Sequence, residues 1–249
     1  MLKSIAAAFS MYSAIPMPYI EWDEKTMRYA FCYFPLVGAV IGLCEYLAFI
    51  LLDMAGVGIM LKSCVAAVLP VIISGGIHID GFMDTSDALG SHADREKKLE
   101  IMKDSHIGAF AVIALTVYMM LYAGLFSEIR RSELFVYACG FFMSRALSGF
   151  FLMAWPKAKK DGLAVMWSSM TDKTAAYILF AEYIICSLIM IVFGGNAGIT
   201  AFILTLCASA VHYFICKKVF GGISGDIAGF FLQITEFAVL LGCVIGGRL

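Results

Sequence analysis

The sequence predicts an all-α fold, a polytopic integral membrane helical bundle with about seven transmembrane helices and an N-terminal amphipathic helix. Of its 249 residues, 61% are hydrophobic and 15% are charged, whereas soluble domains average about 45–50% apolar and about 25% charged residues. The mean hydropathy is +0.88. The apolar residues fall in runs of roughly 20, which is the length that a helix needs to cross about 30 Å of hydrocarbon.

The elements follow in order along the chain. The opening stretch, MLKSIAAAFSMYSAIPMP, is too short to span and has no convincing cleavage site, so it predicts an interfacial amphipathic helix. After a charged passage, the predicted spans lie at about residues 29–52, 57–74, 107–126, 134–155, 175–193, 197–216 and 227–245. No soluble domain is expected beside them, so residues 1–249 are predicted to form a single integral membrane domain.

The distribution of lysine and arginine predicts the orientation. With a cytoplasmic N-terminus, 13 basic residues fall on the cytoplasmic side, and three (Arg130, Arg131 and Arg248) fall on the other side. Lys62 and Arg145 lie inside spans or at their ends. The bias places the long polar passage at 75–108 on the cytoplasmic side.

The cysteines and the distribution of basic residues exclude some classes of protein. The eight cysteines are scattered and form no C-x-x-C pair, so neither a disulfide framework nor a zinc site is expected. The net charge is −1. Because no block of basic residues is present, no nucleic-acid partner is expected.

The passage at 75–108 carries three aspartates, Asp80, Asp84 and Asp87, spaced i, i+4 and i+7. On a helix they would lie within an arc of about 60°. Carboxylates this close repel one another unless a cation lies among them, and an oxygen-rich set suits Mg²⁺. A solvated acidic face is the alternative. Three aspartates on one stripe at the mouth of a span favour a metal site.

Further charged residues follow the aspartates. Arg95, Lys97 and Lys98 are expected on a solvated face at the membrane surface. Lys103 and Asp104 stand just before the third span, close enough in sequence to return to the aspartates. Lys103 would then hold a phosphate, and Asp104 would be a metal ligand or a base. An ordinary surface ion pair is an equally good interpretation of the two.

A second polar passage, GGISGDIAG at 221–229, is predicted on the same side. Its glycines would let the backbone turn, and Asp226 stands where a helix should begin, so it is either a helix cap or part of a ligand site. Several polar residues also fall inside predicted spans, where they usually point into a bundle or cavity. They are Glu45, Arg145, Glu182, His212, Gln233 and Glu236.

At these residues the sequence resembles a known family. GGIHIDGFMDTSDALG, followed by REKKLEIMKDSHIGAF, resembles the signature of the cobalamin synthase family, the adenosylcobinamide-GDP ribazoletransferases. FPLVGAVIG, SRAL at 144–147 and GGISGDIAGFFLQITE fit the same family in the same order. Two positions depart from it, since Ala88 stands where a glycine is common and His106 where an arginine is common.

The resemblance implies a transferase that completes the lower nucleotide loop of cobalamin. The 5′-hydroxyl of α-ribazole, or of its 5′-phosphate, would attack the phosphate attached to adenosylcobinamide, and GMP would leave. The family is Mg²⁺-dependent and lies in the bacterial cytoplasmic (inner) membrane, so the site would face the cytoplasm. The expected partners are these two substrates and membrane lipid, and a homo-oligomer is left open.

The residues fit that chemistry, which needs charge neutralised on the diphosphate and the nucleophile held in line. The predicted metal ligands are Asp80, Asp84 and Asp87. The predicted substrate-binding residues are Gly75, Gly76, Gly81, Lys103, Arg145 and Glu236. The glycines would allow close approach of the diphosphate, and Arg145 and Lys103 would stabilise charge on the departing GMP. The predicted general base is either Asp104 or Asp226.

Three other classes of protein share some of these features. A phospholipid-making CDP-alcohol phosphotransferase would share the aspartates, but here no A-R pair follows D-G-x-x-D-x-x-D. A prenyltransferase would need a second Asp-rich segment, and the second polar passage offers one aspartate. A transporter would use intramembrane charges, but its expected internal repeat is not evident.

Overall fold

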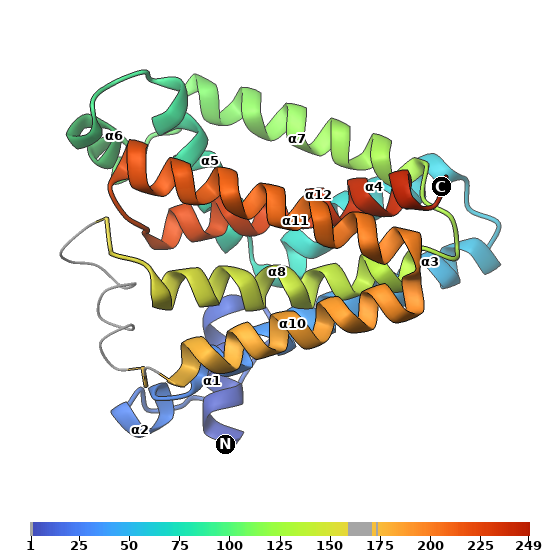
Figure 1. Cartoon of the computed structure of the whole chain (residues 1–249), viewed down its shortest axis with the longest axis horizontal. Coiled ribbons are helices and arrows are strands. Elements are labelled where there is room, and N and C mark those ends of the chain that lie inside the picture. The colour runs from blue at the N-terminus through green and yellow to red at the C-terminus, as the bar shows by residue number, and fades with distance from the viewer. Residues whose placement is uncertain (1, 159–170, 173) are drawn as a thin grey trace.

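The protein is a bundle of long helices that run side by side (Figure 1). The computed structural model describes residues 2–158, 171–172 and 174–249. Within these ranges every regular element is a helix, and the only bridge of β type joins Lys157 to Ile223. The predicted all-α class is therefore confirmed.

Six segments of the described chain are long and apolar enough to cross a membrane. They comprise η1 (Ala30–Tyr33) continued by α3 (Phe34–Met54), α7 (Ala109–Ser127), α8 (Leu134–Ala154), α10 (Thr174–Gly194), α11 (Asn196–Ile215) continued by η2 (Cys216–Phe220), and α12 (Gly225–Gly246). In their most apolar windows, 72% of α8 and 78% of α12 are buried, against 22–39% for the other four. The helices α8 and α12 therefore form the centre of the bundle.

The predicted second span, at residues 57–74, corresponds to α4 (Ile59–Ser74), which is too short to count as a membrane span without the helix that follows it. Helix α4 is followed at once by α5 (Ile77–Gly90), and the two are bent by 101°. Gly75 and Gly76 make the bend with φ values of 67° and 80°, in the left-handed region that side chains disfavour. A seventh membrane span exists only if α4 and α5 are counted together. Because of the bend, α5, which carries the aspartates, runs at a steep angle to α4.

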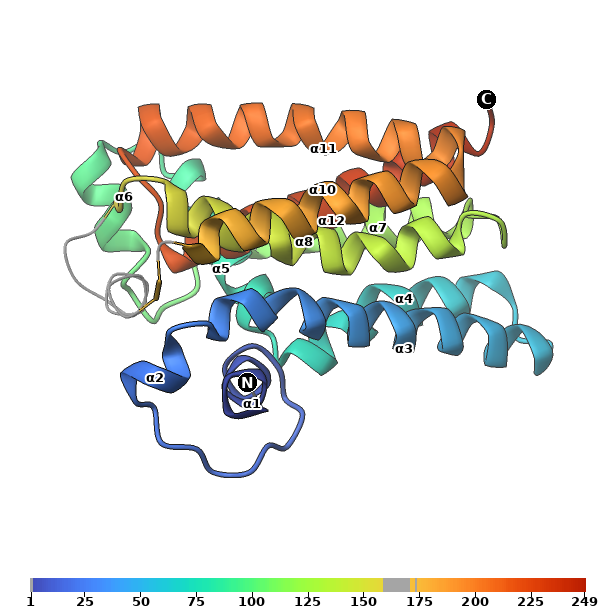
Figure 2. The same ribbon diagram turned by 60° about the horizontal axis from the view of Figure 1, so that its bottom comes forward.

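The predicted N-terminal helix is present as α1 (Leu2–Tyr12), which lies across the bundle and is seen nearly end-on in Figure 2. The ring of Tyr12 lies 4.2 Å from that of Phe34 and stacks 6.0 Å from that of His78. The Ala14 amide donates to the carbonyl of Ile73 at 2.8 Å. Helix α1, followed by the short α2 (Glu24–Met27), therefore supports the chain on both sides of the α4–α5 bend.

The polar connections gather at one end of the bundle, here called the polar end, which comprises residues 91–108, 155–158 and 216–226 (Figure 1). This end includes α6 (Arg95–Ile101), which packs against η2. The described basic residues of the polar end are Arg95, Lys97, Lys98, Lys103, Lys157, Lys217 and Lys218. The opposite end holds the short α10–α11 link and the C-terminus. Arg130 lies at that end, where its guanidinium donates to the carbonyl of Gly247.

The helices α3 and α8 approach each other through two glycines. A Cβ atom built on Gly38 would lie 2.1 Å from the carbonyl oxygen of Phe141, and one built on Gly42 would lie 2.2 Å from that of Ala138. The two glycines are four residues apart, the G-x-x-x-G spacing that lets membrane helices pack backbone to backbone. Larger side chains at either position would force the helices apart.

We expect Gly42→Leu to lower the melting temperature of the detergent-purified protein, because overpacking a close helix contact costs about 1–3 kcal/mol or more. Gly124→Leu is the matched control, since a Cβ at Gly124 in α7 meets nothing within 4 Å. Thermal unfolding of both variants measures the difference. Equal melting temperatures would contradict the packing described here.

Candidate active site

Two polar passages that are far apart in sequence meet where α5 crosses the start of α12. A Cβ built on Gly81 would lie 2.8 Å from the carbonyl oxygen of Asp226 and 2.9 Å from its Cα. On the other side of the crossing, a Cβ on Gly229 would lie 3.2 Å from the carbonyl oxygen of His78. The crossing therefore needs glycine on both helices, and it sets the backbone of Asp226 beside the turn that carries Asp80 and Asp84.

The three aspartates lie on one helix, as their spacing predicts, but in different surroundings. Asp80 is exposed, whereas Asp84 and Asp87 are half-buried. Asp87 Oδ1 accepts a hydrogen bond from the Ala111 amide at 3.3 Å, and a Cβ on Gly108 would lie 2.1 Å from the same carboxylate. The Asp87 carboxylate therefore occupies the N-terminus of α7, where the unpaired amides and the helix dipole favour a negative charge.

The aspartates suit Mg²⁺ in chemistry without forming a closed cage. Across the residues that the structure describes, no three His, Cys, Asp or Glu side chains form a group that could hold a metal ion. Mg²⁺ is usually bound by one or two carboxylates together with water and substrate phosphates. Asp80 and Asp84, one turn apart on α5, fit such an incomplete donor set, and ligation by all three aspartates stays a prediction.

Backbone pairing and caps fix the segment that leads into α12. The Ile223 amide donates to the carbonyl of Pro156 at 2.8 Å, and the Ala158 amide donates back to the carbonyl of Ile223 at 2.9 Å. Ser224 then begins α12, because its hydroxyl accepts from the Ile227 amide at 3.3 Å. The Ser148 hydroxyl of α8 donates to the carbonyl of Ala228 at 2.9 Å. Asp226 thus lies in the first turn of a helix whose entry is held by two other segments.

Lys103 and Asp104 lie in the exposed loop between α6 and α7. Asp104 Oδ1 lies 2.7 Å from Nδ1 of His106 and accepts from the His106 backbone amide at 3.0 Å. These hydrogen bonds hold the pKa of Asp104 below its ordinary value, so the group stays ionised to lower pH. The described side-chain partner of Asp104 is therefore His106, and no ion pair joins Asp104 to Lys103 among the described residues.

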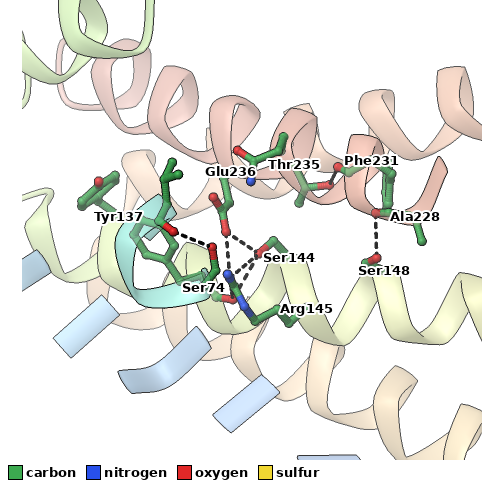
Figure 3. Close-up of polar contacts among 12 residues, drawn as sticks. Ser74, Tyr137, Ser144, Arg145, Ser148, Ala228, Phe231, Thr235 and Glu236 are labelled. Carbon is green, nitrogen blue, oxygen red and sulfur yellow. Dashed lines mark hydrogen bonds and ion pairs between the residues drawn. The ribbon is translucent and has the colours of Figure 1, made fainter. Parts of the chain in front are cut away.

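Arg145 and Glu236 lie in the centre of the bundle, where they bind each other (Figure 3). The guanidinium Nη1 donates to Glu236 Oε1 at 2.7 Å and to the carbonyl of Phe141 at 2.9 Å. Ser144 also donates to the glutamate at 3.2 Å. The side chains of the pair are only 1% and 3% exposed. A phosphate would have to displace Glu236 to reach Arg145, so their substrate-binding roles stay predictions without geometric support.

Several features of the site were missed from the sequence. The sharp bend lies at two consecutive glycines, Gly75 and Gly76. The sequence predicts instead that these glycines let the backbone approach a ligand closely. Lys98 was predicted on a solvated face but is buried, and its amine donates to the carbonyl of Ala93. Arg95 packs its guanidinium against Gly221, a contact between segments that no local pattern in the sequence indicates.

The chain has relatives among known proteins. Residues 4–244 match the family described as Cobalamin-5-phosphate synthase. A protein of Lachnoclostridium phytofermentans is 38% identical over 98% of this chain and 94% of its own length, and one of Clostridium perfringens is 34% identical over 97% of this chain and 98% of its own. A protein of Mesorhizobium japonicum is 28% identical over 96% of this chain and 92% of its own length. All three are named adenosylcobinamide-GDP ribazoletransferase. No solved structure matches the chain.

We expect Arg145→Met to destabilise the protein by about 3–5 kcal/mol, because it leaves Glu236 buried without its partner. The double variant Arg145→Met with Glu236→Met should recover much of that loss, since no unpaired charge remains. Unfolding of the purified single and double variants measures both effects. A double variant less stable than either single one would show that the pair does not act as a unit.

Proposed function

Because the chain belongs to the cobalamin-5-phosphate synthase family, we propose that it joins adenosylcobinamide-GDP to α-ribazole, or to its 5′-phosphate, with release of GMP. The observation that supports this most strongly is similarity over 98% of the chain to a relative named for that reaction. The matched residues include both passages that meet where α5 crosses α12. The whole chain acts in this proposal as a single integral membrane domain.

The chemistry is a displacement at phosphorus. The 5′-hydroxyl oxygen of α-ribazole forms a bond to the phosphate that carries cobinamide, the bond from that phosphorus to the bridging oxygen breaks, and GMP leaves with that oxygen. The hydroxyl proton needs an acceptor. The backbone of Asp226 lies against Gly81 on the aspartate-bearing helix, which favours Asp226 for this role. Asp104 is the weaker candidate, because it lies in an exposed loop and its pKa is lowered.

We further propose that Mg²⁺ is held by Asp80 and Asp84, with Asp87 as the third predicted ligand. When bound, the ion would neutralise charge on the diphosphate oxygens. The protein contributes the bend at Gly75 and Gly76, which sets α5 across the start of α12. Lys103 is exposed on the loop that follows α6, where its amine would be available to the phosphates of the substrate.

The membrane and the orientation belong to the same proposal. The basic residues gather at the polar end, so the positive-inside rule favours a site that faces the cytoplasm of a bacterial inner membrane. The nucleotide-bearing substrate would then be supplied from the cytoplasm.

The substitution Asp84→Asn should lower the rate of GMP release at least about a hundredfold, because it removes a charged ligand from the proposed metal site. GMP and corrinoid products are measured with purified protein, adenosylcobinamide-GDP, α-ribazole and Mg²⁺. Asp53→Asn is the matched control, since Asp53 pairs with Lys62 at the opposite end of the bundle. Near-normal activity of Asp84→Asn would argue against a metal there. Release of CMP from a CDP-alcohol, with no GMP release by the wild type, would support the phospholipid-synthase alternative.

The orientation predicts which sites a membrane-impermeant maleimide reaches in intact spheroplasts. Arg131→Cys, at the end opposite the aspartates, should be labelled from outside, whereas Lys103→Cys should be labelled only after the membrane is opened. Both parent residues are exposed. Labelling of the unmodified chain corrects for its own cysteines. The reverse pattern would place the site outside the cell.

A further inference from the structure

A small pocket of about 150 Å³ opens at the polar end, beside the segment that leads into α12. Its wall includes Trp155 and Tyr213, its floor includes the backbone of Gly221 and Gly222, and Lys217 lies at its side. The proposed chemistry above assigns no role to any of these residues. The ligand of this pocket is therefore a separate question from the chemistry at the aspartates.

Two aromatic rings of the pocket are held in fixed positions by neighbouring rings. The centroid of Trp155 lies 4.1 Å from that of Phe151 in a stacked pair and 5.7 Å from that of His212. Tyr213 meets Trp155 edge-on at 5.1 Å. Trp155 is half-buried and Tyr213 is 46% exposed. Rings that are fixed and partly open are suited to stack against a flat aromatic base.

The rim of the pocket is positively charged. Lys217 is exposed and its amine lies 3.4 Å from the hydroxyl of Tyr213. The Arg95 guanidinium lies against the floor, since a Cβ on Gly221 would come within 2.1 Å of its Cζ. None of the described residues that line the pocket is acidic. An aromatic wall with a cationic rim suits a ligand that combines a flat base with phosphates.

The backbone of the pocket is shaped for close approach. Cys216–Phe220 forms a π-helical turn, a rare conformation that is frequent at functional sites. It ends at Gly221 with a φ of 68°, and a Cβ on Gly222 would lie 2.5 Å from the Ala158 amide nitrogen. Substitution of either glycine would therefore narrow the floor or displace the chain beneath it.

The pocket also lies on the path to the aspartates. Gly221 and Asp226 are five residues apart, so they are separated by at most about 18 Å. That length is of the order of an extended nucleoside diphosphate. A nucleotide whose base lies against Trp155 could therefore extend its phosphates along this segment toward the crossing of α5 and α12.

The geometry points to this pocket as the binding site for the guanosine group of the corrinoid substrate, with the base against Trp155 and the phosphates beside Lys217. The assignment rests on the proposed function, which supplies the guanosine diphosphate group. The negative charges of that group favour this occupant over free α-ribazole, which carries no phosphate.

The test measures binding of GMP to the purified protein by equilibrium dialysis, separately from turnover. Trp155→Ala should weaken GMP binding roughly tenfold, since loss of a stacking ring costs about that much, and Trp155→Phe should restore most of it. Lys217→Gln should also weaken binding roughly tenfold. The control Lys218→Gln removes the same charge from the neighbouring residue, whose amine lies over Phe214 instead, and should bind GMP as the wild type does.

Kinetics separate the failure of this assignment from failure of the proposed function. The assignment predicts that Lys217→Gln raises KM for adenosylcobinamide-GDP and leaves KM for α-ribazole unchanged. An active wild type whose GMP affinity is unaffected by both Trp155→Ala and Lys217→Gln would overturn the assignment alone. A rise in KM confined to α-ribazole would give the pocket to the other substrate and would also overturn it. A folded wild type that releases no GMP would refute the proposed function, and the assignment would fail with it.

Discussion

The arrangement of the polar end depends on one close backbone contact, the crossing of α5 over the first turns of α12. Gly81 and Gly229 leave no room for a side chain at that crossing, so the two helices approach more closely than side chains would allow. The bend at Gly75 and Gly76 gives α5 the direction that the crossing needs. The contact sets the aspartate-bearing turn beside Asp226, and the pocket at Trp155 lies on the chain that leads to it.

Much of the fold could be predicted because hydrophobic runs of about 20 residues and the bias of basic residues are local signals. The spacing of Asp80, Asp84 and Asp87 predicts that they share one face if the segment is helical, and the segment is helical. The bend was not, since a glycine pair is compatible with a ligand loop as well as with a sharp turn. The pairing of residues 156–158 with 222–224 joins segments that are distant in sequence, and no periodicity indicates such a contact.

For the candidate site, the sequence predicts which polar residues are candidates better than it predicts which of them contact one another. The sequence showed which residues are polar in an apolar chain, but it did not show which of them satisfy one another. Asp87 lies at the start of α7, and Arg145 binds Glu236. Both arrangements have the same physical cause, because a charge that is wholly or partly removed from water requires a partner. The crossing of α5 and α12 brings Gly81, which lies between Asp80 and Asp84 in the sequence, against the backbone of Asp226.

The buried pair of Arg145 and Glu236 has a consequence for the order in which the protein is made. The two residues are 91 positions apart in the chain, and α12 is synthesised after α8. Until then α8 carries an arginine whose placement at the centre of a lone membrane helix costs about 2.5–3.5 kcal/mol. Its early neighbours are α3, packed through Gly38 and Gly42, and the ring of Phe34, which lies 6.0 Å from the Arg145 guanidinium carbon. Translation of α12 therefore completes the compensation of a charge that is synthesised 91 residues earlier.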